Sequence, residues 1–416
     1  MGIAELVHRA LNEAPIAIEA YDGSAVSPPG AVVTLQVRSP DALRRFATAP
    51  NDLGLGRAYV AGDIEVEGDL YVALTTLAHT DLRADRSLLV DLARELGVAA
   101  LRPLPPPPEE ARLHGARHSR ERDAAAISHH YDVSNDFYRL MLGPSMTYSC
   151  ALWDDPDVGL DAAQAAKHEL ICQKLALKPG MRLLDVGCGW GSMALHAAEH
   201  HGVEVVGVTI SSRQVEAASE RVKDAGLAGQ VDIRFQDYRD VDDGPFDAIS
   251  SVGMFEHVGR KRLAEYFGHL HDLLRPEGRL LNHGICRPPT ARDARPVPLP
   301  EAPWHRRTFV NRYVFPDGEL HELGTVVSAM QQQGLEVRHS ETLREHYGLT
   351  LRAWVANLEA QWDEAVRLGG LGRARVWRLA NAALAVGFEE GRTQIHQVLA
   401  SRSDDGRSGF SLRPAY

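Results

Sequence analysis

The sequence predicts an α/β protein in which a doubly wound, mostly parallel sheet is joined to a smaller N-terminal mixed α/β domain. Three observations lead to this fold class. From Met181 onward, short apolar runs alternate with segments of helical spacing, which is typical of a parallel sheet with helices on both faces. The first of these runs ends in a glycine-rich turn. A proline run at Pro103–Glu110 separates this region from about a hundred residues of different composition.

The N-terminal hundred residues contain signals for both strands and helices. Val32–Val37 contains the alternation of a half-buried strand, and Leu74–Leu96 has the apolar spacing of helix. The proline run that follows is expected to be extended and stiff, as in a linker. We therefore expect a small domain at 1–102, a proline-rich and basic linker at 103–123, and a large domain at 124–416.

The large domain is expected to begin with a helix and to continue as alternating strands and helices. Short apolar runs bounded by turn residues predict strands, and longer segments with apolar residues three or four apart predict helices. The expected elements, in chain order, are the helix Ala124–Leu142, the strand Met181–Val186, the helix Ser192–His201, the strand Val203–Val208, the helix Ser212–Asp224, and the strands Val231–Phe235, Phe246–Val252 and Arg279–His283.

The charge balance and the cysteines exclude several classes of protein. The 416 residues include 45 Lys and Arg against 56 Asp and Glu, a net charge of −11. This argues against a general nucleic-acid binder, because phosphate contacts need a basic face. The four cysteines lack the CxxC spacing of a zinc site, so we expect free thiols, a reducing compartment and no metal. They are Cys150, Cys172, Cys188 and Cys286.

The sequence gives no sign of a targeting or membrane-spanning segment. Charged residues interrupt Met1–Ala20, which therefore lacks the apolar core of a signal peptide. No run approaches the roughly 18 apolar residues of a spanning helix. The expectation is a cytoplasmic protein whose association with a membrane is peripheral, at its inner face.

The glycine-rich turn reads LLDVGCGWG from Leu183 to Gly191 and lies at the first strand-to-helix junction. Glycines let a ligand approach the backbone closely, and such folds bind nucleotides at the carboxyl ends of their strands. Gly187, Gly189 and Gly191 follow the spacing G-x-G-x-G, and the acidic Asp185 precedes them. This pattern favours S-adenosylmethionine over a dinucleotide, and the alternative is a tight turn that binds no ligand.

The second strand of the sheet ends without the acidic residue that often binds ribose hydroxyls in such folds. It runs instead into the segment TISSRQ at 209–214. Neutral groups must then recognise the ribose, and Thr209 and Gln214 are the candidates.

Several segments together resemble the cyclopropane fatty acid synthase family. The resemblance covers about residues 120–415. The first hundred residues resemble the extra domain of the bacterial phospholipid-modifying branch, which the related mycolic acid synthases largely lack. The matching segments are ISHHYDVSNDFY at 127–138, MTYSCALW at 146–153, LLDVGCGWG at 183–191, VTISSRQ at 208–214, QDYRDV at 236–241, SVGMFEHVG at 251–259, YVFPDGEL at 313–320 and HYGLTLRAW at 346–354.

This resemblance implies a Rossmann-like methyltransferase that uses S-adenosylmethionine to add a methylene group to the cis double bond of an unsaturated acyl chain. The substrate would be a phospholipid in a membrane surface and the product a cyclopropane ring. The resemblance also implies a bound bicarbonate ion, a lipid- or membrane-associated N-terminal domain and a homodimer. The catalytic residues carried over are Cys150, Glu256, His283, Ile285 through its backbone, and Tyr347. Those around the cofactor are Tyr148, Ser149, Asp185, Gly187, Gly189, Gly191, Thr209, Gln214, Asp237, Tyr238 and Arg239.

The chemistry explains why such residues are needed. An isolated alkene is a poor nucleophile, so it must be held in line with an electrophilic methyl group. The resulting carbocation must be kept from water, which calls for apolar and aromatic walls. A base then removes a proton so that the ring closes. Tyr347, His283 and the Ile285 N–H could donate to bicarbonate, Glu256 could accept its proton, and Cys150 offers a weak donor.

Two departures from the family pattern leave the product open. The family reads His-Thr-Ile where this chain has His283-Gly284-Ile285, and Asn282 replaces an apolar residue. A second hypothesis therefore keeps the methyl transfer but yields a methylene- or methyl-branched chain. A third hypothesis is a non-catalytic lipid-binding module, against which the intact glycine-rich turn and Glu256 argue.

Some of these residues also have purely structural interpretations. Cys150 could be a small buried apolar side chain, which is common for cysteine. Glu256 and His257 could be a solvated pair at the start of a helix. We interpret His129 and His130 as packing or lid residues, because adjacent helical side chains point about 100° apart and share a metal poorly.

Three stretches combine basic and aromatic residues and are candidates for contact with lipid headgroups. For each of them the alternative is ordinary surface arginines and core tryptophans. The stretches are Arg112–Arg122, Trp304–Tyr313, and the C-terminal helices with Trp354, Trp362, Arg373, Arg375, Trp377 and Arg378.

Overall fold

The computed structural model describes residues 2–82, 86–97, 102–123, 126, 134–288 and 308–414. The chain divides into two compact units, each built from several stretches of sequence. The first comprises Met1–Arg112, Pro296–Pro316 and Leu358–Val386, and the second comprises Leu113–Arg295, Asp317–Asn357 and Gly387–Tyr416. These units differ from the domain limits expected from the sequence, because two later segments of the chain belong to the first unit.

The first unit is a small mixed α/β structure, as the sequence predicts. Its four-stranded sheet has the order β2-β1-β3-β4, in which β1 and β3 are parallel and the other pairs antiparallel. Its strands are β1 (Ala17–Ala20), β2 (Ala25–Val26), β3 (Thr34–Val37) and β4 (Ile64–Glu67), and its helices include α1 (Ile3–Ala10), α2 (Pro40–Thr48), α3 (Asp52–Ala61), α4 (Leu70–Ala78), α5 (Arg86–Leu96), α13 (Phe309–Tyr313), α16 (Trp362–Gly369) and most of α17 (Leu371–Glu389).

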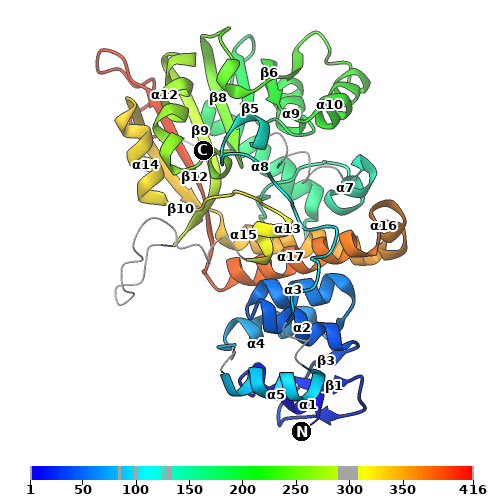
Figure 1. The fold of residues 1–416 in the computed structure, drawn as a ribbon. Coiled ribbons are helices and arrows are strands. Elements are labelled where there is room, and N and C mark those ends of the chain that lie inside the picture. The colour runs from blue at the N-terminus through cyan, green and yellow to red at the C-terminus, as the bar shows by residue number, and fades with distance from the viewer. Residues whose placement is uncertain are drawn as a thin grey trace. The chain divides into compact units, whose positions relative to one another are not determined.

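The second unit is built on an eight-stranded, doubly wound sheet, which confirms the predicted fold class (Figure 1). Seven strands follow the order β11-β12-β9-β8-β5-β6-β7, and β10 pairs with β9. The strands from β7 to β9 are parallel, and β12 is antiparallel to both of its neighbours. The strands are β5 (Arg182–Val186), β6 (Glu204–Thr209), β7 (Val231–Phe235), β8 (Phe246–Val252), β9 (Leu274–Arg287), β10 (His321–Glu322), β11 (Leu335–Thr342) and β12 (Gln394–Arg402).

The expected elements of this unit are confirmed between β5 and β9, with differences at their ends. β9 is longer than the predicted strand Arg279–His283, and neither β11 nor β12 was predicted. Of the predicted helix Ala124–Leu142, the structure contains α7 (Asn135–Leu142), and most of the remainder lies outside the described residues. The other helices are α8 (Leu160–Leu175), α9 (Ser192–His201), α10 (Ser212–Asp224), α11 (Phe255–Val258), α12 (Leu263–Leu273), α14 (Leu323–Gln332) and α15 (Arg344–Ala360).

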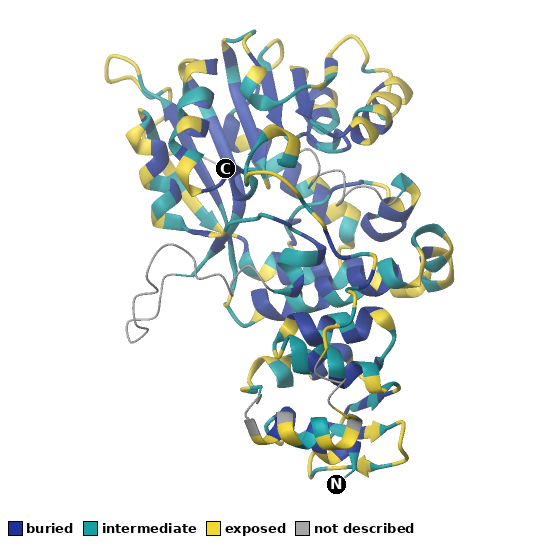
Figure 2. Ribbon diagram, viewed as in Figure 1, coloured by how far each residue is buried: buried dark blue, intermediate teal, exposed yellow. Residues whose placement is uncertain are grey.

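Adjacent residues of the central strands pack into two different cores, which is why helices cover both faces of the sheet (Figures 1 and 2). Leu184 and Val206 pack in a core with residues of α12 and α14. Their neighbours Leu183 and Val205 pack in a second core with residues of α8 and α9. Side chains of a strand alternate between its faces, so a run that is apolar throughout fits a strand buried on both.

The order in which the chain adds strands to the sheet reverses at β5, because β6 pairs with one side of β5 and β8 with the other. In open α/β sheets, ligands bind outside the carboxyl ends of the strands at this switch point. The glycine-rich turn follows β5 directly, so the fold places it there. Among the described residues, no helix is long and apolar enough to cross a bilayer.

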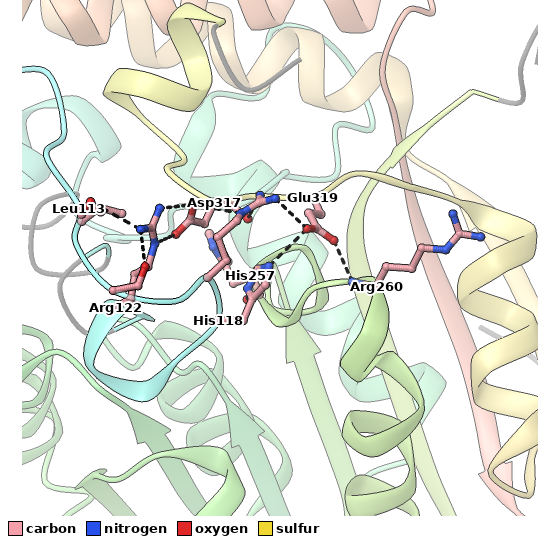
Figure 3. Close-up of polar contacts among 9 residues, drawn as sticks. Leu113, His118, Arg122, His257, Arg260, Asp317 and Glu319 are labelled. Atoms are coloured by element: carbon pink, nitrogen blue, oxygen red, sulfur yellow. Dashed lines mark hydrogen bonds and ion pairs between the residues drawn. The ribbon is translucent and has the colours of Figure 1, made fainter. Parts of the chain in front are cut away.

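Ion pairs and hydrogen bonds hold the segment after the proline run, which includes His118 and Arg122, against later residues of the second unit (Figure 3). The guanidinium of Arg122 pairs with both carboxylate oxygens of Asp317. His118 lies between the carbonyl oxygen of His257, 3.1 Å from Nδ1, and the carboxylate of Glu319, 3.4 Å from Nε2. The hydrogen bond from His118 lowers the pKa of Glu319 to about 2. Residues 118–122 are therefore held against His257, which follows β8, and against the segment Asp317–Glu319, which precedes β10.

This pairing changes the interpretation of the basic stretch Arg112–Arg122. Arg117 pairs with Asp317 and Glu319, and Arg120 forms a two-point pair with Asp240. Their charges are thus compensated within the chain. The same holds for Arg375, which pairs with Glu65, while Trp354 and Trp377 are buried. In the stretch Trp304–Tyr313, Arg312 pairs with Glu110, Phe309 and Tyr313 are buried, and residues 304–307 lie outside the described residues.

A close approach between β9 and α11 gives a prediction about stability. A Cβ atom on Gly284 would lie 2.1 Å from Cε1 of Phe255, whereas a Cβ on Gly324 of α14 would meet no atom within 4 Å. Overpacking a core costs about 1–3 kcal/mol. We expect Gly284→Ala to lower the midpoint of thermal unfolding by several degrees. Gly324→Ala, the control, should leave it unchanged or raise it slightly. An unchanged midpoint in Gly284→Ala would mean that the Phe255 ring moves aside freely.

Candidate active site

The glycine-rich turn is held against the end of β6 by its own backbone. The N–H groups of Gly187 and Cys188 both donate to the carbonyl oxygen of Val208, at 2.9 and 3.0 Å. Gly187 has a φ of +75°, and a Cβ there would lie 2.3 Å from the sulfur of Met254. Only glycine fits this combination of left-handed backbone and close packing. The turn therefore exposes backbone at the carboxyl end of β5, where a ligand can approach it.

Asp185 lies one residue before the end of β5 and is buried. Its Oδ1 accepts a hydrogen bond of 2.6 Å from the hydroxyl of Ser250, while its Oδ2 has no hydrogen-bond partner among the described residues. Burial raises the pKa of this carboxyl to about 6, although the Ser250 bond and the charge of Lys167 oppose the rise. The carboxylate thus keeps a free acceptor beside the turn.

The two residues expected to contact a ribose bind each other. The hydroxyl of Thr209, at the end of β6, donates to Oε1 of Gln214 on α10 over 2.7 Å. Ser211 caps the same helix by accepting from the Gln214 N–H at 3.3 Å. Both side chains are buried, so the end of β6 has a fixed neutral polar surface. Their contact with a ribose remains a prediction.

Asp237 and Arg239 form a closed pair after β7. The guanidinium of Arg239 donates to both carboxylate oxygens of Asp237, at 2.8 and 2.6 Å, and lies 5.4 Å from the ring centre of Tyr238. Burial alone would raise the pKa of Asp237, but the hydrogen bonds and charge of Arg239 outweigh it and lower that pKa. The three residues predicted here do lie together, and their internal pair fixes the loop.

Aromatic rings form a continuous row from the glycine-rich turn to α15. Tyr148 stacks on Trp354 with centroids 5.1 Å apart, and Trp354 meets the edge of Tyr347 at 6.0 Å. In the other direction Tyr148 contacts Tyr138 at 6.2 Å, and Tyr138 lies 4.9 Å from Trp190. This row joins a predicted cofactor residue to a predicted catalytic one. A row of this kind fits the expectation of an aromatic wall.

Glu256 and the Ile285 backbone, both predicted from the sequence, are in direct contact. Oε1 of Glu256 accepts a 2.6 Å hydrogen bond from the Ile285 N–H. Its Oε2 is buried and has no hydrogen-bond partner among the described residues. Burial raises the pKa of Glu256 to about 7, and the Ile285 bond limits the rise. Glu256 is therefore not a solvated helix residue but a buried carboxyl with one oxygen held and one free.

The proton of His283 can be placed from its neighbours. Lysine only donates, so Lys174, whose Nζ lies 2.7 Å from the side-chain oxygen of Gln397, fixes the orientation of that amide. The Gln397 Nε2 then donates to Nδ1 of His283 over 3.1 Å. Burial and the charges of Lys167 and Lys174 lower the pKa of His283 well below its usual value, so the ring is neutral. Its proton is consequently on Nε2, which has no partner among the described residues.

Cys150 is fully buried, as the structural interpretation expected. Its Sγ lies 3.2 Å from the carbonyl oxygen of Ala151 and 3.6 Å from that of Leu343, one residue before α15. Burial raises the pKa of the thiol, so it is protonated and a hydrogen-bond donor. Tyr347 lies one turn further along the chain and its N–H donates to the same Leu343 carbonyl at 3.1 Å. Cys150 and Tyr347 therefore meet at the start of α15.

Sequence reasoning missed the residues that orient these groups. Gln397 lies on a strand that was not predicted, directly across the β9–β12 pair from His283. Lys167 and Lys174 are buried on α8, where lysines in an apolar helix face were a signal that could have been used. Trp354 was a candidate for lipid contact with a core position as the alternative, and its burial supports the core position.

The histidines outside this site have other partners. His196 and His201 both lie on the carboxylate of Glu169, at 3.3 and 3.0 Å, and together with Cys172 they form a compact group. The hydrogen bonds of these two histidines lower the pKa of Glu169 to about 2 against the effect of burial. His201, at the end of α9, is therefore bound to a carboxylate of α8. His129 and His130 lie outside the described residues.

A doubly wound sheet with a glycine-rich turn at its switch point and a buried acid beside it is the arrangement expected of an S-adenosylmethionine-dependent methyltransferase. Residues 118–398 match the family described as mycolic acid cyclopropane synthetase. The chain therefore belongs to the cyclopropane synthase family of methyltransferases.

Relatives with known names agree with this assignment. The chain is 44% identical to a "Probable fatty acid methyltransferase" of Mycobacterium tuberculosis over 100% of this chain and 98% of that protein. It is 35% identical to the cyclopropane-fatty-acyl-phospholipid synthase of Escherichia coli, covering 88% and 87%. A solved mycolic acid cyclopropane synthase, bound to S-adenosylhomocysteine and CTAB, matches 67% of this chain and 97% of its own with 33% identity and a TM-score of 0.62. The enzyme class and the binding of S-adenosylmethionine thus have direct support.

The hydrogen bonds of His283 give a prediction that does not depend on turnover. Gln397→Glu keeps an acceptor for Lys174 but removes the donor to Nδ1, so the proton of His283 should move from Nε2 to Nδ1. Nitrogen chemical shifts of histidine-labelled protein report which ring nitrogen carries the proton. Gln394→Glu, on the same strand, is the control and should leave His283 unchanged. An unchanged His283 in Gln397→Glu would contradict the assigned tautomer.

Proposed function

We propose that this enzyme transfers a methylene group from S-adenosylmethionine to the cis double bond of an unsaturated acyl chain in a membrane phospholipid, forming a cyclopropane ring. The observation that carries the proposal is the arrangement around Glu256. A buried carboxyl with one free oxygen lies beside a strand whose His283 presents a free N–H, at an edge of the sheet lined by aromatic rings.

The cofactor would be held by the glycine-rich turn, by Asp185 and by the polar end of β6. Bound there, it would supply an electrophilic methyl group. The chain's task is then to hold the double bond in line with that group, and the row that includes Tyr148 and Trp354 offers a flat apolar surface for an acyl chain. The same rings exclude water, which would otherwise trap the carbocation on the acyl chain.

A bicarbonate ion would fit the polar groups that remain. Such an ion needs an acceptor for its hydroxyl and donors for its other oxygens. The free Oε2 of Glu256 is the acceptor, and the free Nε2–H of His283 is a donor. The phenol of Tyr347 and the thiol of Cys150, at the start of α15, would complete the set. Bound there, bicarbonate would supply the base that the new methyl group requires. The Ile285 N–H, expected to bind the ion, is instead used by Glu256.

A phospholipid is supported as the substrate by the extent of the likeness. The relative named cyclopropane-fatty-acyl-phospholipid synthase matches 88% of this chain, so the likeness includes much of the first unit. A relative named cyclopropane mycolic acid synthase matches only 59%. We further propose that the enzyme acts peripherally at the inner face of the membrane, as a homodimer. Arg117, Arg120 and Arg122 are paired within the chain. Arg312 of the stretch 304–313 is paired as well, with Glu110, so pairing singles out neither stretch for docking.

A branched product is the second candidate. It is favoured by the names of the relatives that are 44% and 40% identical, both given as probable fatty acid methyltransferases. The two candidates share the methyl transfer. A methylene branch forms if a hydride first shifts to the neighbouring cationic carbon and the new methyl group then loses its proton, whereas a saturated methyl branch would also need a hydride donor as reductant.

The experiment that separates them is a product analysis. The purified enzyme is incubated with S-adenosylmethionine and vesicles of monounsaturated phospholipid, and the acyl chains are examined by mass spectrometry and proton NMR. Cyclopropyl protons are the expected result. An exomethylene or branched-methyl signal without them would replace the first candidate by the second. No cofactor turnover at all would favour a lipid-binding module.

The raised pKa of Glu256 predicts the pH dependence of the reaction. Only the ionised carboxyl accepts a proton, so the rate should rise as the pH increases through about 7. Glu256→Gln should lose about 100-fold or more in rate and also lose this dependence. Tyr347→Phe should slow the reaction less, by about tenfold.

In both variants the affinity for S-adenosylhomocysteine, measured by calorimetry, should stay within about a factor of two. Tyr266→Phe is the matched control, because it removes a buried hydroxyl that is bonded to Ser251 and is not among the groups proposed to bind a reactant. A large loss of cofactor affinity in Glu256→Gln would show that Glu256 belongs to the cofactor site instead.

A further inference from the structure

Helix α8 buries two lysines of its own. Lys167 and Lys174 are each 1% exposed, and seven residues place them two turns apart on one side of the helix. A buried ammonium is retained only where other groups compensate its charge. The two lysines differ in whether the chain supplies that compensation.

Lys174 is fully paired within the chain. Its ammonium forms an ion pair with Glu341 and donates to the amide oxygen of Gln397 at 2.7 Å. The first partner supplies the opposite charge and the second fixes the amide that orients His283. Lys174 thus has a complete structural explanation.

Lys167 has no such partner. Its Nζ donates to the hydroxyl of Ser149 over 3.0 Å, and no carboxylate of the described residues lies within the 4.0 Å of an ion pair. An ammonium has three protons to donate, so hydrogen-bonding capacity remains. Burial lowers its pKa to about 8, and the nearby Cys150 and Asp185 oppose that shift. At neutral pH the group is therefore still mostly a cation.

The neighbours of Lys167 indicate what it binds. Ser149 belongs to the segment expected to surround the cofactor, and Asp185 lies on the strand below the glycine-rich turn. Asp185 offers a free acceptor, Oδ2, close enough to interact electrostatically with Lys167. The site therefore presents a cation with spare donors and an anion with a spare acceptor. A free amino acid end, with its carboxylate and its ammonium, has the complementary charges.

We propose that Lys167, together with the Ser149 hydroxyl, binds the α-carboxylate of S-adenosylmethionine, while Asp185 receives its α-ammonium. This inference rests on the cofactor of the proposed function, but not on which lipid product is formed. It assigns to α8 a direct part in cofactor binding, in addition to the segments already expected to surround the cofactor.

The test compares two ligands that differ in the amino acid end. Calorimetry without lipid gives the dissociation constants of S-adenosylhomocysteine, which has this end, and of 5′-methylthioadenosine, which lacks it. Lys167→Met should weaken binding of the first by about 10- to 100-fold, the range for a charge-assisted hydrogen bond. Binding of the second should change by no more than about twofold. Lys174→Met is the matched control, with S-adenosylhomocysteine binding within about twofold of the wild type.

The pH dependence is a second readout. In the wild type, affinity for S-adenosylhomocysteine should fall as the pH rises beyond the Lys167 pKa of about 8, because the ammonium loses its charge. In Lys167→Met the fall should become smaller, and what remains would come from the α-ammonium of the ligand itself, which also loses its proton at alkaline pH. If Lys167 were merely structural, the wild type and Lys167→Met would show the same fall.

Three results would overturn the assignment. One is unchanged S-adenosylhomocysteine affinity in Lys167→Met, and another is an equal loss for both ligands. The third is normal cofactor affinity combined with a higher bicarbonate requirement for turnover, which would give the cation to bicarbonate instead. Because the binding assay contains no lipid, failure of the product assay leaves this result intact, and the two proposals fail separately.

Discussion

The desolvation of a few ionisable groups at the carboxyl edge of the sheet is the constraint on which the whole site depends. Asp185, Glu256 and His283 are all buried. Burial favours the neutral form of each group, so it raises the pKa of the two carboxyls and lowers the pKa of the imidazole. Each has one polar atom bound to a neighbour and a second atom with no partner among the described residues. A buried polar atom without a hydrogen bond is costly. The free atoms of these three groups are therefore the ones on which the proposed binding of cofactor and bicarbonate rests.

The surrounding structure serves to hold these groups while leaving their second atoms free. The Ile285 N–H binds one oxygen of Glu256, Ser250 binds one oxygen of Asp185, and Gln397 binds one nitrogen of His283. Each holding partner lies on a different strand from the group's own element, so the register of the sheet sets the geometry. Fixed orientation matters here because a dry site offers no water to reorganise around a developing charge.

The sequence predicted the parallel strands well because each is a short apolar run between turn residues. The strand β12 was not predicted, because it is antiparallel to its neighbours and includes polar residues such as Gln397, whose partner His283 is distant in sequence. The catalytic candidates followed from motifs, whereas Lys167 and Gln397 follow only from knowing what surrounds them. The basic residues were also a misleading signal. Arg117, Arg120 and Arg122 suggested a lipid surface, but their carboxylate partners lie more than a hundred residues away in the sequence.

The two departures from the family pattern, Asn282 and Gly284, both lie in the strand β9. Leu280 and Cys286 pack in the core with α12, and Leu281 packs in the core with α8, so even and odd positions face opposite ways. Asn282 and Gly284 are therefore on the face opposite His283. Asn282 lies 3.5 Å from the Ser251 hydroxyl, and Gly284 makes room for the ring next to Glu256. Both departures therefore lie on the face opposite His283, one of them against the ring next to Glu256, and they leave the imidazole side of the strand unchanged.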